Sequence, residues 1–303
     1  MDVQIAKVCG LCAGCTLAIK TTENEIKKGN KVTIFKEIVH NKNVNKYLAS
    51  IGATCEEDIE KLPKDNTIVV RAHGEPPETY AYFKDNNIEY VDCTCPNVAK
   101  IHEKVKEYSD KGYKIIILGK YKSKMHPEVL GTIGWSSTEV VIIEEKSDLT
   151  KLNYYKNDKL YLVCQTTFNM SKADVLINKI KQIANKNMCE LIINKSLCNA
   201  QKAINNSSVE LALDCDIMVV VGGANSSNSL ELYNNVRTFC PSIFIEDIYT
   251  YKDALNDNNI EIKPNTKVGI TAGASTRKEE LVELKNLIEG DWEIKQIKGS
   301  KEE

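Results

Sequence analysis

The segment DCTCPNVAKIHEKVKEYSDK, at residues 92–111, contains the pattern on which the fold prediction rests. Beyond Pro96 its apolar residues recur at the spacing of one helix face, which predicts an amphipathic helix over residues 96–111. Proline suits the first turn of a helix, so Cys95 is the predicted N-cap. The apolar residues of this face are Val98, Ile101, Val105 and Tyr108.

Two other cysteines stand before helical patterns in the same way. Cys12 precedes the pattern of residues 13–28 and Cys198 that of residues 199–213, so the three cysteines are 83 and 103 residues apart. Backbone N–H groups and the helix dipole at a helix N-terminus lower the pKa of a thiol, and the thiolate is the form that ligates metal. We therefore expect three similar units whose cysteines together hold three irons of a cubane cluster and leave the fourth iron open.

Short β-branched runs alternate with amphipathic segments along the chain. Such alternation is typical of α/β domains built on largely parallel sheets. We expect three α/β domains, over residues 13–95, over 96–195 and over 196–282 together with 1–12, followed by a C-terminal tail at 283–303. The predicted strands are Lys31–Phe35, Thr67–Arg71, Lys114–Leu118, Val140–Ile143, Leu160–Cys164, Ile217–Val221, Ile243–Ile245 and Lys267–Thr271.

Composition limits the kinds of partner that this chain can have. The 303 residues are 42% hydrophobic, and the net charge of −2 gives no reason to expect nucleic-acid binding. No apolar run reaches the roughly 18 residues of a membrane helix, and no signal peptide is visible, so we expect no membrane partner and a cytoplasmic location. Eleven cysteines are an odd number for a reducing compartment, which favours metal ligation and ordinary burial over disulfides.

Three of the four histidines, His40, His73 and His126, follow predicted strands, where α/β proteins place ligand-binding groups. His102 lies inside the predicted helix and is expected to be an ordinary helix residue, either partly exposed or satisfied. Glu128 follows His126 by two residues. A carboxyl group near an open metal site can deliver protons if its pKa is raised, so Glu128 is a candidate acid, although its sequence context alone favours an ordinary surface glutamate.

Clusters of hydroxyl and amide side chains also follow predicted strands, at residues 165–167, 225–229 and 269–275. Such neutral donors, placed after a strand and before a helix, suit a bound anion. No Walker pattern and no Gly-x-Gly-x-x-Gly pattern is present, which argues against a nucleotide hydrolase and a Rossmann dehydrogenase. We therefore expect a phosphorylated ligand.

Cys9, Cys12 and Cys15 form a Cys-x-x-Cys-x-x-Cys run that is similar to part of a bacterial ferredoxin run. It lacks the following Cys-Pro, and it enters the helix predicted over 13–28, where Cys9 and Cys15 need not face the partner of Cys12. An electron carrier or redox sensor is therefore an alternative to the site with three units, although it leaves the histidines and hydroxyl clusters without a purpose.

Taken together, these motifs resemble the 4-hydroxy-3-methylbut-2-enyl diphosphate reductases, the LytB/IspH family. They occur in the family's order and span nearly the whole chain. The matching segments are Gly10-Leu-Cys-Ala-Gly14, Glu37-Ile-Val-His-Asn41, Ala72-His-Gly74, Asp92-Cys-Thr-Cys-Pro96, His126-Pro-Glu-Val129 with Gly131-Thr132, Gln165-Thr-Thr167, Asn225-Ser-Ser-Asn-Ser229 and Thr271-Ala-Gly-Ala-Ser275.

The resemblance implies a pseudo-threefold trefoil of three α/β domains around a central [4Fe–4S] cluster. It implies that the allylic hydroxyl of 4-hydroxy-3-methylbut-2-enyl diphosphate is removed with two protons and two electrons from a ferredoxin or flavodoxin. The products would be isopentenyl and dimethylallyl diphosphate plus water, in the terminal step of the methylerythritol phosphate pathway. Glu128 would pass protons and Thr166 would help to position the reacting end. By motif position the metal ligands would be Cys12, Cys95 and Cys198, and the substrate would contact His40, His73, His126, Thr166, Ser226, Ser227, Asn228 and Ser275.

Several positions depart from the family's pattern. After the third cysteine the family usually reads Ala-Thr-x-x-Arg-Gln, whereas residues 200–205 read Ala-Gln-Lys-Ala-Ile-Asn. Arg277 stands where proline is common, and Cys9, Cys15 and Cys93 replace other residue types. Residues around metal ligands tune a site, so a paralogue that reduces or dehydrates a different small substrate is a second alternative.

Overall fold

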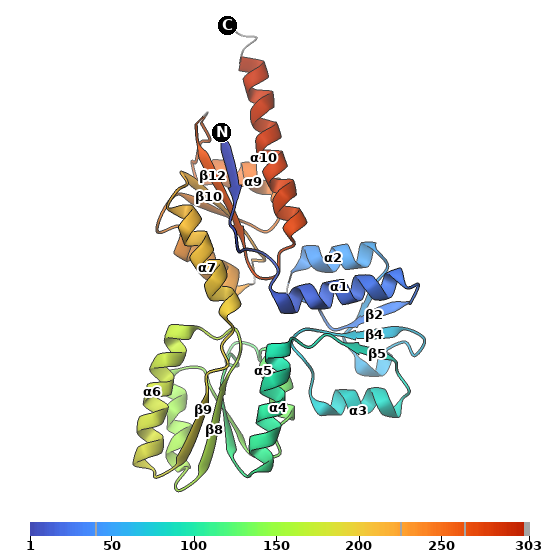
Figure 1. Ribbon diagram of the computed structural model, residues 1–303, viewed down its shortest axis with the longest axis vertical. Helices are drawn as coiled ribbons and strands as arrows, with labels where there is room; N and C mark the ends of the chain where they lie inside the picture. Colours follow the sequence, from blue (N-terminus) through green and yellow to red (C-terminus); the bar gives the residue numbers. More distant parts are fainter. Residues whose placement is uncertain (40, 225, 264, 300–303) are drawn as a thin grey trace. The chain divides into compact units, whose positions relative to one another are not determined.

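The computed structural model contains three four-stranded sheets, A, B and C, each flanked by helices (Figure 1). It describes residues 1–39, 41–224, 226–263 and 265–299, and only the backbone of Ser227 and of residues 292–299. The chain divides into two compact units, of which unit 1 holds sheet A and unit 2 holds sheets B and C. Unit 1 is Met1–Thr16, Val39–Ser50 and Asn199–Glu303, and unit 2 is Leu17–Ile38 and Ile51–Cys198.

The three sheets are parallel throughout and share one strand order. In each sheet, the strand that comes second along the chain lies at one edge. The first, third and fourth strands follow it in space, in that order. Sheet A keeps this order because the N-terminal strand β1 serves as its fourth strand. Sheet B is β3 (Thr54–Glu56), β2 (Val32–Phe35), β4 (Thr67–Val70) and β5 (Tyr90–Asp92); sheet C is β7 (Val140–Ile143), β6 (Lys114–Leu118), β8 (Lys159–Cys164) and β9 (Glu190–Asn194); sheet A is β11 (Ser242–Ile245), β10 (Ile217–Val221), β12 (Lys267–Ala272) and β1 (Asp2–Ile5).

The helices also recur in order: a helix joins the first and second strands, a 3-10 helix the second and third, and a helix follows the third. A further helix follows each fourth strand. In sheet B these elements are α2 (Lys42–Ser50), η1 (Ile59–Lys61), α3 (Pro77–Asp85) and α4 (Pro96–Asp110); in sheet C they are α5 (Pro127–Gly134), η2 (Lys146–Tyr154), α6 (Met170–Lys186) and α7 (Asn199–Ala212); in sheet A they are α8 (Ser227–Val236), η3 (Ile248–Thr250) with α9 (Tyr251–Asp257), α10 (Lys278–Gly299) and α1 (Ala13–Lys27).

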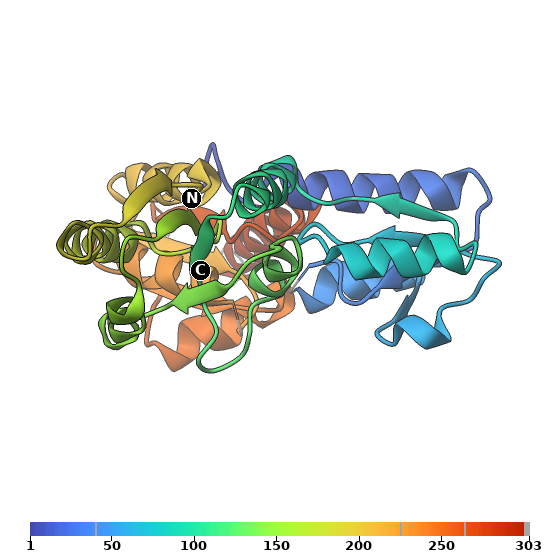
Figure 2. The ribbon, with the colours of Figure 1, turned by 90° about the horizontal axis from the view of Figure 1, so that it is seen from below.

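Apolar side chains on both faces of each sheet explain these layers. The two central strands of every sheet are buried almost throughout and are rich in Val and Ile, as parallel strands covered on both faces are. In sheet C, α6 packs on one face and α4 with α5 on the other. In sheet B, α1 and α3 both run along the strand direction (Figure 2).

All eight predicted strands are present, which confirms the α/β fold class with three similar sheets. Four further strands were not predicted from the sequence: β1, β3, β5 and β9. Each of them lies at the edge of its sheet and has few buried residues. The domain boundaries themselves stay a prediction.

The predicted tail at 283–303 needs a correction. Helix α10 begins at Lys278 and continues through residue 283 without a break. Leu284 is fully buried and Ile288 is 2% exposed, and both belong to the core between α10 and sheet A. The segment up to Ile288 is therefore part of this domain, and residues 300–303 lie outside the described part of the chain.

The same backbone contact positions the three candidate ligand cysteines. In each sheet the carbonyl of the second residue after the third strand accepts a hydrogen bond from the N–H of the cysteine that follows the fourth strand. The cysteine therefore comes to the carboxyl end of the parallel strands, directly before a helix. The three bonds are Cys12 to Ala274 at 3.1 Å, Cys95 to Ala72 at 2.9 Å and Cys198 to Thr166 at 2.8 Å.

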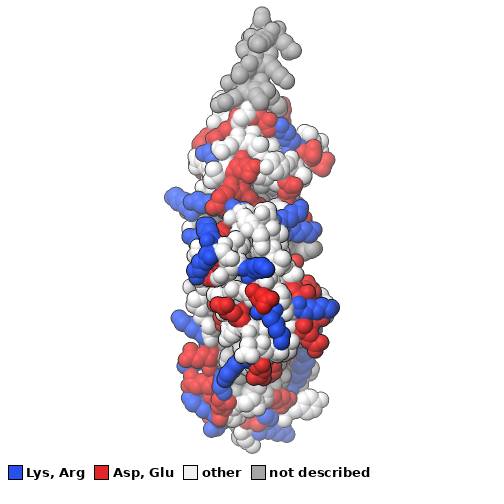
Figure 3. Space-filling view, turned by 90° about the vertical axis from the view of Figure 1, so that its right-hand side faces the viewer, with Lys and Arg blue, Asp and Glu red and all other residues white. Residues whose placement is uncertain are grey.

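The surface mixes both signs of charge. On the face drawn in Figure 3, Lys and Arg side chains are interspersed with Asp and Glu. Among the described residues, no helix combines the length and the apolar character that crossing a bilayer requires.

Candidate functional site

Glu128 and Thr166 form a buried polar contact at the carboxyl end of sheet C. Glu128 lies in the first turn of α5 and is 2% exposed, while Thr166 follows β8 and is 7% exposed. The backbone N–H of Thr166 donates to Glu128 Oε1 at 2.6 Å, and its hydroxyl donates to Oε2 at 2.7 Å. The Thr166 carbonyl accepts the N–H of Cys198. One residue thus links the candidate acid to a candidate metal ligand.

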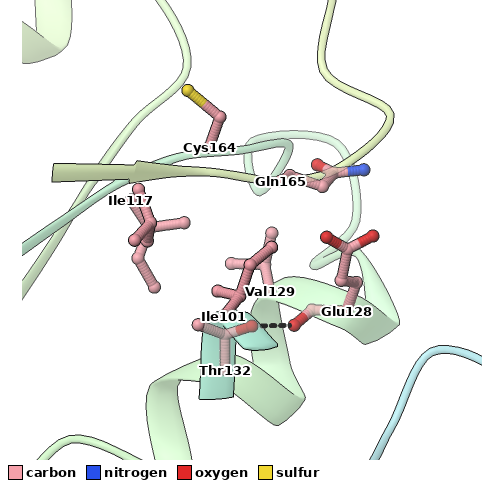
Figure 4. A pocket seen from close by; sticks show the side chains of 8 residues that line it. Ile101, Ile117, Glu128, Val129, Thr132, Cys164 and Gln165 are labelled. Atoms are coloured by element: carbon pink, nitrogen blue, oxygen red, sulfur yellow. Dashed lines mark hydrogen bonds between the residues drawn. The ribbon is translucent and has the colours of Figure 1, made fainter. Parts of the chain in front are cut away.

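Burial raises the pKa of Glu128 to about 7, although the two hydrogen bonds from Thr166 act in the opposite direction. Figure 4 shows the carboxyl group beside Gln165, while the Glu128 carbonyl accepts a hydrogen bond from the Thr132 hydroxyl at 2.7 Å. Mostly apolar side chains line this crevice, which has no room for a water molecule. Glu128 therefore keeps a proton at a pH where an exposed glutamate has lost it.

Cys198 lies beside the N-terminus of α4, the helix that Cys95 precedes in unit 2. Cys95 is the N-cap of α4, as predicted, and Pro96 follows at the first helical position. In the next position Asn97 donates its Nδ2–H to Cys198 Sγ at 3.6 Å. The N-terminus of α4 is thus brought to the sulfur of Cys198.

Cys12 belongs to unit 1 and precedes α1. Its sulfur lies 3.4 Å from that of Cys15 and accepts the Cys15 backbone N–H at 3.5 Å. The hydrogen bond between the side chains of Cys12 and Cys15 is the main reason why the pKa of Cys12 is lowered to about 6. Cys9 differs, because burial raises its pKa to about 11 and its thiol donates to the Ala6 carbonyl. Cys15 therefore contacts Cys12, whereas the Cys9 thiol bonds the Ala6 carbonyl.

His73 and His126 are brought together in unit 2. Their ring centroids are 5.4 Å apart and their planes are nearly perpendicular, at 79°. His73 follows β4 of sheet B, while His126 is the N-cap of α5, where its Nδ1 accepts the Glu128 N–H at 3.2 Å. Two sheets thus contribute one imidazole each to a shared site.

Two of the three hydroxyl clusters, at residues 225–229 and 269–275, lie at the carboxyl end of sheet A, in unit 1. Ser226 is the N-cap of α8 and accepts the N–H of Ser229 at 3.3 Å and its hydroxyl at 3.0 Å. Ser229 is fully buried, and a Cβ on Gly273 would lie only 2.1 Å from its oxygen, so only glycine fits there. The segments after β10 and β12 are thus held side by side, with Asn228 in the first turn of α8 and Ser275 after β12.

Asn41 connects this cluster to α2. Its Nδ2–H donates to the Ser275 carbonyl at 2.9 Å, and its Oδ1 accepts the N–H of Asn43 at 2.9 Å. The sequence did not single out Asn41 or Ser229 as positioning residues. The signal was present, since both lie within quoted motifs. His40 lies outside the described residues, as does the side chain of Ser227.

The positions that depart from the family's pattern form contacts of their own. Gln201 Nε2 donates to Asn205 Oδ1 at 3.2 Å along α7, and Ile204 is 2% exposed in the core of unit 1. The Arg277 guanidinium lies 3.5 Å from the ring centroid of Tyr47 on α2. These residues replace the family's side chains with local packing.

Iron–sulfur clusters are held by cysteine thiolates. Within the described ranges, no three Cys, His, Asp or Glu side chains are gathered as a metal site. The individual cysteines nevertheless suit such a group, since each of the three directly precedes a helix N-terminus, where a thiolate is stabilised. They are Cys12, Cys95 and Cys198.

Comparison with known proteins agrees with these observations. A protein from Clostridioides difficile strain 630, named 4-hydroxy-3-methylbut-2-enyl diphosphate reductase, is 34% identical over 277 residues, which cover 91% of this chain and 95% of that protein. A protein of the same name from Helicobacter pylori strain Shi470 is 32% identical over 280 residues, covering 91% and 94%.

Two solved structures are similar in fold. The E-1-hydroxy-2-methyl-but-2-enyl-4-diphosphate reductase from Plasmodium falciparum has a TM-score of 0.78 and 29% identity, with 94% of this chain and 87% of that chain covered. A structure of (E)-4-hydroxy-3-methyl-but-2-enyl diphosphate reductase, called the terminal enzyme of the non-mevalonate pathway, has a TM-score of 0.73 and 28% identity, covering 96% and 100%. Residues 3–289 match the family described as "LytB protein". The chain therefore belongs to the LytB family.

Proposed function

We propose that this protein removes the allylic hydroxyl of 4-hydroxy-3-methylbut-2-enyl diphosphate, using two electrons and two protons, to form isopentenyl and dimethylallyl diphosphate and water. The observation that carries the proposal is the hydrogen-bonded line from Glu128 through Thr166 to Cys198. It joins a carboxyl group that is protonated near neutral pH to the backbone of a candidate metal ligand. Relatives named for this substrate, matched over 91% of the chain, support the same conclusion.

Cys12, Cys95 and Cys198 would hold a [4Fe–4S] cluster. Three thiolates suit such a cluster and leave one iron without a protein ligand. When bound, the cluster supplies the electrons and Lewis acidity toward the hydroxyl oxygen of the substrate.

Glu128 would supply the proton that lets the hydroxyl leave as water, since hydroxide is a poor leaving group. The proton resides on a carboxyl group whose Oε2 lies 2.7 Å from the Thr166 hydroxyl, and a hydroxyl can both accept and donate a hydrogen bond. Thr166 would therefore orient this proton and help to position the reacting end of the substrate. The closed crevice around Glu128 keeps bulk water from taking the proton.

The diphosphate group would be bound by imidazoles, hydroxyls and an amide. Such donors suit an anion in a protein of low net charge. Binding energy gained at the diphosphate, remote from the reacting carbon, would orient the alcohol. These residues are His40, His73, His126, Ser226, Ser227, Asn228 and Ser275.

The test is turnover by anaerobically purified protein with a reconstituted cluster and a strong chemical reductant. We expect the hydroxy diphosphate to be consumed and both products to form. In the cell, a ferredoxin or flavodoxin would be the natural electron donor. The protein would be located in the cytoplasm. Full cluster occupancy without turnover would reject the proposal and favour a paralogue with another substrate. A cluster that survives Cys12→Ala, in a protein that binds no diphosphate, would favour an electron carrier or sensor.

A further inference from the structure

Glu75, two residues after His73, is a buried carboxylate with two cationic partners. It is 1% exposed, its Oε1 accepts Arg71 Nε–H at 2.7 Å, and its Oε2 accepts a Lys36 Nζ–H at 2.7 Å. Arg71 is itself only 6% exposed. A buried charge that loses its partner is strongly unfavourable, so these contacts hold the loop firmly. The loop between Arg71 and Glu75 is the one that carries His73.

Lys36 reaches Glu75 from an uncommon backbone conformation. It directly follows β2 and has φ of 64°, in the left-handed region that lysine rarely adopts. Its N–H donates to the Glu56 carbonyl at 2.8 Å, which holds this turn in place. A strained residue that persists in a folded protein points to a role for the contact it makes. Here that contact is the ion pair with Glu75.

The backbone of the same loop packs against α5. Trp135, which follows α5, donates its Nε1–H to the Glu75 carbonyl at 3.1 Å. A Cβ on Gly131 would lie 3.0 Å from the Gly74 carbonyl oxygen, so helix and loop are in direct backbone contact. His126 is the N-cap of α5, so the helix that packs against the loop of Glu75 also carries the second imidazole.

His102 completes the packing of this loop. Its ring stacks on Trp135, with centroids 5.4 Å apart, and its Cε1 would lie 2.6 Å from a Cβ on Gly74. It is 4% exposed, and its Nε2 has no hydrogen-bond partner among the described residues, unlike the exposed or satisfied residue that the sequence predicted. Burial lowers the pKa of His102 to about 4, so it is neutral at physiological pH. The charges at Glu75 are therefore those of Arg71 and Lys36.

We propose that Glu75 is a positioning residue: its carboxylate, held by Arg71 and Lys36, and its carbonyl, held by Trp135, lock the His73 loop against the helix of His126 and thereby set the spacing of the two imidazoles. The inference rests on the proposed function, since it takes these imidazoles to bind the substrate's diphosphate. It adds four residues to the set that decides substrate affinity. Lys36, Arg71 and Glu75 follow strands of sheet B, and Trp135 follows α5.

Two variants of the cluster-loaded protein test this role. Trp135→Phe removes the indole N–H together with the five-membered ring and leaves a smaller aromatic ring against His102, whereas Glu75→Gln removes the charge of the carboxylate. The readouts are the Kd of inorganic diphosphate by calorimetry, and kcat and KM separately. We expect Kd and KM to rise together, about fivefold for Trp135→Phe, which loses one neutral hydrogen bond, and more for Glu75→Gln. A change confined to binding leaves kcat close to wild type.

Glu25→Gln is the matched control. Glu25 is 8% exposed and is bound by Lys28 and Asn30 just before β2, at the opposite end of sheet B from His73. The Glu25→Gln variant should have a lower midpoint of thermal unfolding than the wild type, with the Kd of diphosphate and the KM unchanged. The inference is overturned if Trp135→Phe and Glu75→Gln leave Kd and KM unchanged, as expected for Glu25→Gln. It is also overturned if the two variants lower kcat alone because less of the protein is active.

The measurement separates this inference from the proposed function. Diphosphate binding does not require turnover, so a wild-type protein that binds diphosphate but converts no substrate would reject the reaction only. A wild-type protein that binds no diphosphate would overturn both. If Glu75→Gln does not fold, Trp135→Phe alone decides the outcome.

Discussion

Thr166 contacts both carboxyl oxygens of Glu128, through its backbone N–H at 2.6 Å and its hydroxyl at 2.7 Å, and its carbonyl accepts the N–H of Cys198. A single residue therefore orients the proposed acid and fixes the backbone of a proposed metal ligand. Glu128 comes from α5, whereas Cys198 follows β9 on the other side of β8. The contacts of this site lead to five predictions.

Glu128→Gln should lower kcat by a factor of about 100 or more, because the amide keeps the shape of the side chain but has no acidic proton. The cluster content should equal that of the wild type. Turnover with a chemical reductant, normalised to iron per chain, measures the effect. A variant with more than half of the wild-type kcat would mean that another group delivers the proton.

The stability of the protein should depend on Glu128 in a pH-dependent way. Since its pKa is raised from 4.5 to about 7, the folded state keeps a proton that the unfolded state loses as pH rises from 4.5 to 7. The penalty reaches about 3 kcal/mol above pH 7 and vanishes below pH 4.5. Urea unfolding should find Glu128→Gln more stable than wild type at pH 8 and similar to it at pH 4. Equal stabilities at pH 8 would show that Glu128 ionises normally.

Thr166→Val should change the pH profile as well as the rate. Wild-type kcat should fall as pH rises through about 7, where Glu128 loses its proton. The Thr166 hydroxyl lowers this pKa, so its removal should move the decline to higher pH and reduce kcat about tenfold. Thr132→Val is the control, because the Thr132 hydroxyl bonds the carbonyl of Glu128 and not its carboxyl group. If Thr166→Val and Thr132→Val show the same pH profile of kcat, the proposed action of the Thr166 hydroxyl on the Glu128 carboxyl group is rejected.

Replacing the proposed ligands should remove the cluster, while replacing a neighbouring cysteine should not. Cys12→Ser, Cys95→Ser and Cys198→Ser should each lose most of the iron and acid-labile sulfide per chain. Cys9→Ser should retain both, because the half-buried Cys9 thiol donates a hydrogen bond to the Ala6 carbonyl. Iron and sulfide analysis after anaerobic reconstitution measures this. Loss of the cluster in Cys9→Ser would revive the ferredoxin-like interpretation.

Ser226→Ala should raise KM several-fold with little change in kcat, because Ser226 is proposed to bind the diphosphate far from the reacting carbon. It should also cost about 1 kcal/mol of stability, since Ser226 caps α8. Asp58→Ala removes a cap of η1 and serves as the control for lost stability alone. An unchanged KM in Ser226→Ala would exclude Ser226 from substrate binding.

Local pattern predicted the strands that carry several buried residues, which include all of the central strands. The central strands were found because their Val and Ile runs are needed on both faces of a parallel sheet. The edge strands β1, β3, β5 and β9 carry too few buried residues to stand out, and neighbouring strands alone give them their conformation. The predicted tail at 283–303 was wrong in its first residues, because Leu284 and Ile288 of α10 pack in the core with sheet A.

Residue types and spacings are enough to identify the chemical groups that this protein can use: three cysteines before helices, histidines and hydroxyls after strands, and a glutamate beside His126. Residue type and spacing act locally. Which of these groups are buried together depends on the tertiary fold. Glu128 owes its raised pKa to burial, Glu75 meets Lys36 across 39 residues, and Asn41 reaches Ser275 across 234. Desolvation and hydrogen bonding depend on neighbours in space, and a linear pattern does not specify them.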